Sequence, residues 1–291
     1  MEMQTQIWTI GELRFTVDTD GPVSGPPVLL LHGFPQTRHM WRHQLRALAA
    51  AGYRGVAPDQ RGYSAGARPP TVESYAGELL TADALALMDS CQARRFHLVG
   101  HDWGGQLAWL IAARHPDRVA TLTILSRPHP GAFARAMAED PEQAKRSQHH
   151  TAFRQPDAIN RLRQDNFKTL RSALEREGVG RTNLDAHFQT LSEPGALEAA
   201  INWYRANNIA SGEIPPVSVP TLYVWGTADA SVGRCAAELT EQFVSGPYRF
   251  VQIEGGGHFI VDQFPDRIAE LMIEHLRGTS LCSGGGAAIE S

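Results

Sequence analysis

The sequence predicts an α/β protein with a mostly parallel sheet, helices on both faces and an inserted helical segment. Two observations support this prediction. Through residue 125, short apolar runs alternate with amphipathic stretches, an order typical of a parallel sheet buried between helical layers. From residue 129 to residue 214 the pattern becomes helical and polar, and at about 85 residues this stretch is too long for a plain loop.

The expected elements follow one another along the chain. Strands are predicted where apolar runs are continuous, at residues 27–32, 53–59, 95–100, 119–125, 221–225 and 248–253. Helical patterns lie between and after them, at residues 40–51, 72–89, 106–114 and 265–277. The domains predicted from this order are a core in two parts (residues 1–128 and 215–278), a helical cap (residues 129–214) and a disordered tail (residues 279–291).

Composition excludes several classes of function. The 27 basic and 31 acidic residues give a net charge of −4, and the basic residues are scattered, so we expect neither a nucleic-acid nor a membrane partner. No apolar run approaches the roughly 20 residues that cross a bilayer, and the first residues lack a signal-peptide pattern. The three cysteines lie far apart in the sequence, which argues against a disulfide framework. These features predict a cytoplasmic protein.

One histidine pair has a spacing that can hold a metal. His39 and His43 lie four residues apart on a predicted helix. No third ligand accompanies them in the sequence, so a solvated helix face is the better interpretation. We expect no metal and no other cofactor.

Residues 100–104, Gly-His-Asp-Trp-Gly, lie between a predicted strand and a predicted helix. Glycines two positions before and after Asp102 are typical of a nucleophile elbow, a turn so tight that only small residues fit beside it. A glycine-rich turn with a helix-capping aspartate is the alternative interpretation. We favour the elbow because strand, turn and helix follow in the required order.

The residue at the tip of this turn is an aspartate, and its chemistry differs from that of serine. A serine needs a base to remove its proton, whereas an aspartate with the ordinary pKa of about 3.9 is already ionised. Asp102 can therefore attack a saturated carbon directly, displacing a halide or opening an epoxide, and form a covalent alkyl ester. This predicts a two-step hydrolase and disfavours ordinary esterase or protease chemistry.

Hydrolysis of such an ester needs a histidine that activates water and an acid that orients the histidine. His258 follows the last predicted strand, and Asp229 follows the strand before it. A single aspartate or histidine in a loop is more often a capping or solvated residue, but nucleophile, acid and base in this order at successive strand ends indicate a catalytic triad. The ester also needs hydrogen-bond donors for its carbonyl oxygen. The backbone N–H groups of Phe34 and Trp103 are the expected oxyanion hole, holding an oxygen of Asp102 itself.

These motifs resemble a known family. His-Gly-Phe-Pro-Gln at residues 32–36, Asp-Gln-Arg-Gly-Tyr at 59–63 and Gly-His-Asp-Trp-Gly-Gly at 100–105 look like those of the α/β-hydrolase epoxide hydrolases and their haloalkane and haloacetate dehalogenase relatives. The resemblance implies the α/β-hydrolase fold with an inserted helical cap. It also implies a small apolar substrate and water as the reactants.

The cap favours the epoxide hydrolase branch. Asn-Trp-Tyr-Arg at residues 202–205 resembles the cap segment whose tyrosine binds the epoxide oxygen, which gives Tyr204 that role by resemblance; packing within the cap is the alternative. The family usually has two such tyrosines, whereas this chain has none between Tyr75 and Tyr204. Aligning the segment around Phe153 puts His149 where the first tyrosine would be, either as a donor in its place or as a solvated surface residue.

Two further functions stay open from the sequence. A dehalogenase would use the same Asp102 step, with Trp103 and cap groups such as Trp203 holding the halide. However, haloacetate dehalogenases have an arginine after the nucleophile, where this chain has Trp103. A catalytically silent hydrolase-fold binding protein is the other alternative, disfavoured because it has no need for a triad. We expect Phe153 and Trp203 to contribute to an apolar substrate pocket.

Overall fold

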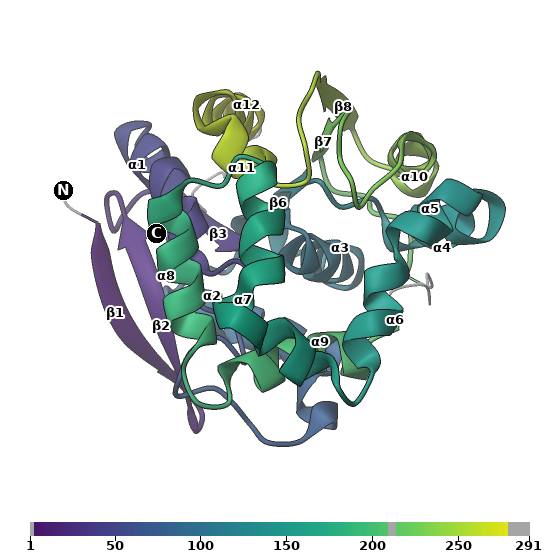
Figure 1. Ribbon diagram of the computed structural model, residues 1–291. Coiled ribbons are helices and arrows are strands. Elements are labelled where there is room, and N and C mark those ends of the chain that lie inside the picture. Colours follow the sequence, from purple (N-terminus) through teal and green to yellow (C-terminus); the bar gives the residue numbers. More distant parts are fainter. Residues whose placement is uncertain (1–2, 209–213, 279–291) are drawn as a thin grey trace, which may run out of the picture.

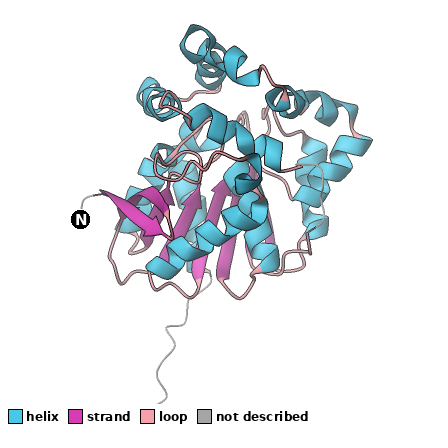
Figure 2. Ribbon diagram, turned by 90° about the horizontal axis from the view of Figure 1, so that it is seen from below, coloured by secondary structure: helices cyan, strands magenta, loops and turns pink. Residues whose placement is uncertain are grey.

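A computed structural model describes residues 3–208 and 214–278 of the chain. The predicted tail, residues 279–291, and residues 209–213 at the end of the predicted cap lie outside the described residues. Within the described part, an eight-stranded sheet has helices on both of its faces, as Figures 1 and 2 show. This confirms the predicted fold class.

The sheet has the strand order β1-β2-β4-β3-β5-β6-β7-β8. From β3 to β8 all neighbours are parallel, and β2 pairs antiparallel with both β1 and β4. The strands are β1 (Gln4–Ile10), β2 (Leu13–Asp20), β3 (Pro27–Leu31), β4 (Arg54–Pro58), β5 (Phe96–His101), β6 (Val119–Leu125), β7 (Thr221–Gly226) and β8 (Tyr248–Ile253). All six predicted strands are present, while β1 and β2 were not predicted.

The two faces of the sheet carry separate apolar clusters because side chains alternate along each strand. In β3, Val28 and Leu30 pack with the helices α1 (Arg42–Ala50) and α12 (Pro265–Arg277). The intervening Leu29 and Leu31 pack on the opposite side, in the larger cluster. That cluster includes side chains of α2 (Gly77–Ser90) and α3 (Trp103–Arg114). The described parallel strands are thus covered on both faces.

The region between β6 and β7 is helical, and its helices gather beyond one end of the strands (Figures 1 and 2). They are α4 (Pro130–Glu139), α5 (Pro141–Arg146), α6 (Gln148–Arg154), α7 (Ala158–Arg176), α8 (Arg181–Leu191) and α9 (Ala196–Ala206). We call these helices, together with the loops that join them, the cap. In α7 the helical backbone is interrupted at residues 164–167, where Asp165, Asn166 and Phe167 have φ angles of 48°, 55° and 60°.

The remaining elements are short. They are η1 (Arg38–Trp41), η2 (Val72–Tyr75), α10 (Arg234–Leu239), η3 (Thr240–Phe243) and α11 (Ile260–Gln263). Two helices differ from the prediction: the segment expected as one helix at 72–89 is divided into η2 and α2, and α3 begins at Trp103 rather than at residue 106. Among the described residues, none of the helices combines the length and apolar character that crossing a bilayer requires.

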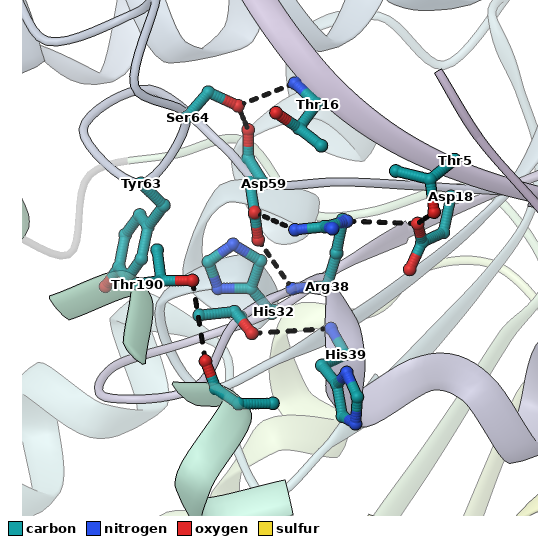
Figure 3. A network of polar contacts seen from close by, with 12 residues as sticks. Thr5, Thr16, Asp18, His32, Arg38, His39, Asp59, Tyr63, Ser64 and Thr190 are labelled. Atoms are coloured by element: carbon teal, nitrogen blue, oxygen red, sulfur yellow. Dashed lines mark hydrogen bonds and ion pairs between the residues drawn. The ribbon is translucent and has the colours of Figure 1, made fainter. Parts of the chain in front are cut away.

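A buried ion network fixes the loop that follows β3 (Figure 3). Arg38 lies between Asp18 of β2 and Asp59, the residue after β4: its Nε donates to Asp18 at 3.0 Å, and its backbone N–H donates to Asp59 at 2.9 Å. Its Nη1 also pairs with Asp59. Thr5 of β1 donates to the same Asp18 oxygen at 2.6 Å. The unpredicted antiparallel strands thus help to hold the loop that carries Phe34.

Candidate active site

Asp102 lies at the tip of the turn between β5 and α3, in a backbone conformation that few residues adopt. Its φ and ψ angles are 50° and −120°. The turn packs so closely that a Cβ atom on Gly104 would lie 2.1 Å from the carbonyl oxygen of Leu31, and one on Gly33 would lie 2.3 Å from the Cβ of Asp102. Larger residues at these glycines would displace the strained turn that holds the carboxylate.

Backbone donors hold the Asp102 carboxylate. The N–H of Phe34 donates to Asp102 Oδ1 at 2.8 Å, and the nearby backbone N–H of Trp103 helps to lower the pKa of the carboxyl group. These are the two groups that the sequence analysis predicted as an oxyanion hole. Phe34 binds Oδ1, and the other oxygen, Oδ2, is the one that lies on the side of His258.

His258 lies between the two aspartates. Its Nδ1 is 2.9 Å from Asp229 Oδ2, and its Nε2 is 3.5 Å from Asp102 Oδ2. The Asp229 side chain is fully buried and also accepts backbone N–H groups from Ser231 at 2.7 Å and Val232 at 2.9 Å. These bonds fix the Asp229 carboxylate. Because a carboxylate only accepts hydrogen bonds, the hydrogen between Asp229 and His258 is on Nδ1 of His258. The three predicted triad residues therefore lie in one row, with His258 hydrogen-bonded to Asp229 and within ion-pair distance of Asp102.

Burial and charge set the protonation of this row. Burial disfavours ionisation of Asp102, but the hydrogen bond and positive charge of His258 outweigh it and lower the pKa of the carboxyl below its usual range. Burial likewise opposes protonation of His258, yet the charges of Asp229 and Asp102 raise its pKa well above the usual value. The side chains of Asp102 and His258 keep 15% and 7% exposure. Asp102 is therefore an ionised carboxylate that is partly accessible to solvent.

His101, the residue before the nucleophile, supports His258 from the sheet. Its Nε2 lies 2.8 Å from the carbonyl oxygen of His258, so Nε2 carries a hydrogen and donates. Burial lowers the pKa of His101 to about 4, which keeps the ring neutral at neutral pH. This contact was not predicted from the sequence.

Tyr204 lies in α9 with its ring against two predicted site residues. Its centroid is 5.0 Å from that of Phe153 and 5.6 Å from that of Phe34. Burial, followed by the negative charge of Asp102, raises the pKa of Tyr204 well above 10. The phenol therefore stays protonated and can donate a hydrogen bond.

The two neighbouring histidines of α6 occupy different environments. His149 is half-buried, and its Nδ1 lies 3.0 Å from the carbonyl oxygen of Arg146, so Nδ1 carries the hydrogen. A neutral His149 consequently presents an acceptor at Nε2. His150, which the sequence analysis did not single out, is the one whose ring faces Tyr204 at 5.3 Å and Trp103 at 6.3 Å. Burial lowers the pKa of both rings, that of His150 to about 2.

The structure argues against the halide-holding role that the dehalogenase alternative gave to Trp203. Its indole N–H donates to the carbonyl oxygen of Arg61 at 2.8 Å, and the side chain is buried. The N–H is therefore not available to a substrate or a halide, and the residue packs against Trp103 instead. By contrast, the buried Nε1 of Trp103 makes no hydrogen bond of normal geometry among the described residues, although the Trp103 side chain lies close enough to Tyr204 to act on the pKa of its phenol. The prediction could not separate these indoles because a backbone acceptor leaves no sequence signal.

A buried cation that the sequence analysis missed lies near the triad. Arg127, just after β6, is 3% exposed, donates Nε and Nη2 to Gln106 Oε1 at 3.0 and 2.8 Å, and stacks over Phe133 at 4.2 Å. Burial lowers its pKa to about 10, and the charge of Asp102 acts in the opposite direction. Within residues 3–208 and 214–278, no carboxylate comes within ion-pair distance of it, so Asp102 and Arg127 interact only at longer range.

Histidine, cysteine and acidic side chains do not gather into a metal-binding group anywhere in the described ranges. His43 pairs with Asp266 at 2.9 Å, while His39 packs against His187. His39 and His43, which were weighed as a metal-binding pair, thus contact different residues.

Comparisons with known proteins show the family of this chain. Residues 26–265 match the family model described as the alpha/beta hydrolase fold. The chain is 36% identical over 279 residues to Epoxide hydrolase 4 of Mus musculus, covering 91% of this chain and 77% of that protein. It is 33% identical over 312 residues to Epoxide hydrolase A of Mycobacterium tuberculosis, covering 92% and 96%.

Solved structures give the same result. A structure titled as novel epoxide hydrolases from metagenomes of hot environments superposes with a TM-score of 0.83 at 27% identity, covering 95% of this chain and 99% of that one. Epoxide Hydrolase A of Mycobacterium thermoresistibile superposes with a TM-score of 0.80 at 27% identity, covering 96% and 99%.

Proposed function

This chain belongs to the epoxide hydrolase family of the alpha/beta hydrolase fold, and from that membership we propose that it opens an epoxide to a diol through an ester on Asp102. The observation that best supports the covalent route is the direction of the backbone donors. Phe34 donates to Asp102 Oδ1 in the free protein, as an oxyanion hole for an aspartyl ester requires.

In the first step, Asp102 Oδ2 attacks an oxirane carbon and the carbon–oxygen bond of the ring breaks. The ring oxygen leaves as an alkoxide and takes the phenol proton of Tyr204. Tyr204 suits this role because its proton is retained and its ring lies against Phe34 and Phe153. The product is a hydroxyalkyl ester of Asp102.

In the second step, His258 Nε2 removes a proton from water, and the water oxygen attacks the ester carbonyl of Asp102. The N–H groups of Phe34 and Trp103 hold the resulting oxyanion. When this intermediate collapses, His258 returns its proton to the departing diol oxygen. The proton on the regenerated carboxyl group passes to the Tyr204 phenolate, so that one water is consumed for each epoxide.

His149 takes a secondary place in this proposal. Since its Nδ1 hydrogen is directed to Arg146, only the doubly protonated ring has a hydrogen left for the epoxide oxygen. Burial lowers its pKa and disfavours that form. We therefore assign the proton donation to Tyr204, and to Phe153 a packing role beside the substrate.

One observation favours a second candidate, a haloalkane dehalogenase. The buried indole N–H of Trp103 makes no hydrogen bond of normal geometry in the described part of the chain and is suited to a halide ion. The test is to offer the enzyme a styrene-type epoxide and a short bromoalkane, measuring diol and bromide. Diol formation supports the epoxide hydrolase, and bromide release alone supports the dehalogenase. No turnover of either by folded protein would favour a non-catalytic binding protein.

A further inference from the structure

The cap contacts the backbone of the base through one carboxylate. Glu177 directly follows α7, and its Oε2 accepts the backbone N–H of His258 at 2.5 Å. The nearby backbone N–H of Phe259 favours the charged form of the same carboxylate. The loop before His258 fits closely around this group, because a Cβ atom on Gly257 would lie 2.7 Å from Glu177 Oε2. Gln263 holds the Gly257 N–H from the other side at 2.7 Å.

Both polar groups of the His258 main chain are therefore bound by side chains. Glu177 of the cap holds its N–H, and His101 of β5 holds its carbonyl oxygen at 2.8 Å. The ring itself is oriented by Asp229. A backbone fixed at both ends leaves the imidazole little freedom to leave the line between Asp229 and Asp102, so the cap contributes directly to the alignment of the base.

We propose that Glu177 is a positioning residue for His258. Through this contact, the packing of the cap on the core affects the step in which His258 activates water. The inference rests on the proposed two-step reaction. Glu177 touches the main chain of the base rather than the substrate, so its loss affects the step in which His258 acts. Attack by Asp102 depends on Phe34, Trp103 and Tyr204, none of which bonds to Glu177, and is expected to continue.

Three substitutions separate the hydrogen bond from the charge. Glu177→Gln keeps an acceptor oxygen at the same reach, Glu177→Asp keeps the charge but shortens the side chain, and Glu177→Leu removes both. Glu193→Gln is the matched control. Glu193 is also a cap carboxylate bound to the core, through Arg68 at 2.7 Å, but it does not contact the His258 loop.

The experiment mixes each variant with excess styrene-type epoxide, quenches at intervals and follows the mass of the intact protein and the diol formed. Glu177→Leu and Glu177→Asp should form the Asp102 ester at the wild-type rate but hydrolyse it about 10- to 100-fold more slowly, so that the ester accumulates. Glu177→Gln should retain most of the wild-type hydrolysis rate, and Glu193→Gln should match wild type in both steps.

Other results overturn the inference. If Glu177→Asp behaves as wild type while Glu177→Gln accumulates ester, the charge acts rather than the positioning bond. If ester hydrolysis is unchanged in Glu177→Leu, or both steps slow equally, the contact is merely structural. Should Glu177→Leu not fold, the Asp and Gln variants still decide between these outcomes. If wild type turns over epoxide without any ester on Asp102, the proposed reaction is wrong and the inference falls with it.

Discussion

His258 Nε2 and Asp102 Oδ2 lie 3.5 Å apart, on the side of the carboxylate that the backbone donors leave open. With this arrangement the two residues can act in successive steps of the reaction. Oδ2 is free to attack while Oδ1 remains bound by Phe34, and His258 is already beside the carboxylate when water must attack it. The two steps are therefore separable by substitution.

Replacing His258 by phenylalanine should preserve the first step and block the second. The variant is expected to accumulate an ester, visible as a mass increase equal to that of the intact epoxide. Asp102→Asn should give neither adduct nor diol, because a neutral amide is a poor nucleophile. An unmodified His258→Phe protein after long incubation would contradict the covalent mechanism.

Heavy-oxygen water gives an independent check on the same mechanism. In a single wild-type turnover, the label should enter the Asp102 carboxylate, because water attacks its carbonyl carbon. The diol then carries the unlabelled oxygen of Asp102. Peptide mapping by mass spectrometry locates the label, and finding it only in the diol would indicate direct attack of water on the epoxide.

The Arg38 bridge should contribute strongly to stability. Arg38→Met leaves the buried carboxylates of Asp18 and Asp59 without their shared cation, which is expected to lower the free energy of unfolding by about 3 kcal/mol. The control is Arg135→Met, which removes an exposed pair with Glu139 and should change it by less than about 0.5 kcal/mol. Urea unfolding measures both, and equal losses would mean that the buried bridge has no special weight.

The interruption in α7 predicts opposite effects of glycine at two exposed asparagines. Asn160 lies in the helical part, where glycine should cost about 1 kcal/mol of stability. Asn166 has a φ of 55°, a conformation that glycine adopts without strain, so Asn166→Gly should be neutral or slightly stabilising. Thermal unfolding of the two variants tests this, and equal destabilisation would argue for a regular helix through residue 166.

The parallel core and its catalytic loops could be predicted because their signals are local. A buried parallel strand is a continuous apolar run, and the tight turn around Asp102 requires glycines at fixed positions. The strands β1 and β2 were missed because antiparallel strands alternate polar and apolar residues instead of forming a continuous apolar run. The buried Phe15 and Val17, either side of Thr16, were the available signal.

Contacts between the cap and the core could not be predicted from the sequence for a different reason. Glu177 reaches His258 across 81 residues of chain, and no motif marks an acceptor of a backbone N–H. The identity of the histidine facing Tyr204 depended on the rotation of α6, which resemblance could not give. A halide-binding role for the indole N–H of Trp203 was left open because no motif marks the main-chain carbonyl that holds it.

Tyr204 and His149 can be separated as proton donors. Tyr204→Phe should slow ester formation about 100-fold or more, because the alkoxide then leaves without a proton. Hydrolysis of an ester once formed should remain at the wild-type rate. His149→Phe should change ester formation little, since the neutral ring presents no hydrogen to the epoxide. Stopped-flow and quench measurements give both rates, and a large loss in His149→Phe alone would reverse the assignment.

The pH dependence of ester hydrolysis should differ from the titration of His258 in the free enzyme. In the free enzyme, burial lowers the pKa of His258, but the charges of Asp229 and Asp102 more than compensate and raise it. Forming the ester removes the charge of Asp102, whereas the neighbouring Asp229, Glu177 and His101 are unchanged. The pKa of His258 must therefore fall in the ester.

Because His258 acts as a base only when neutral, hydrolysis should rise with pH through this lower pKa. The protein holds His258 as an imidazolium beside the ionised nucleophile. Alkylation of Asp102 lowers the pKa of His258 and so increases the fraction of the ring that is neutral and can act as a base. Asp102→Asn mimics the ester's neutrality, so nuclear magnetic resonance should give a lower His258 pKa in this variant than in wild type. That lower value should coincide with the midpoint of the single-turnover hydrolysis profile, and a pKa unchanged by Asp102→Asn would contradict the coupling.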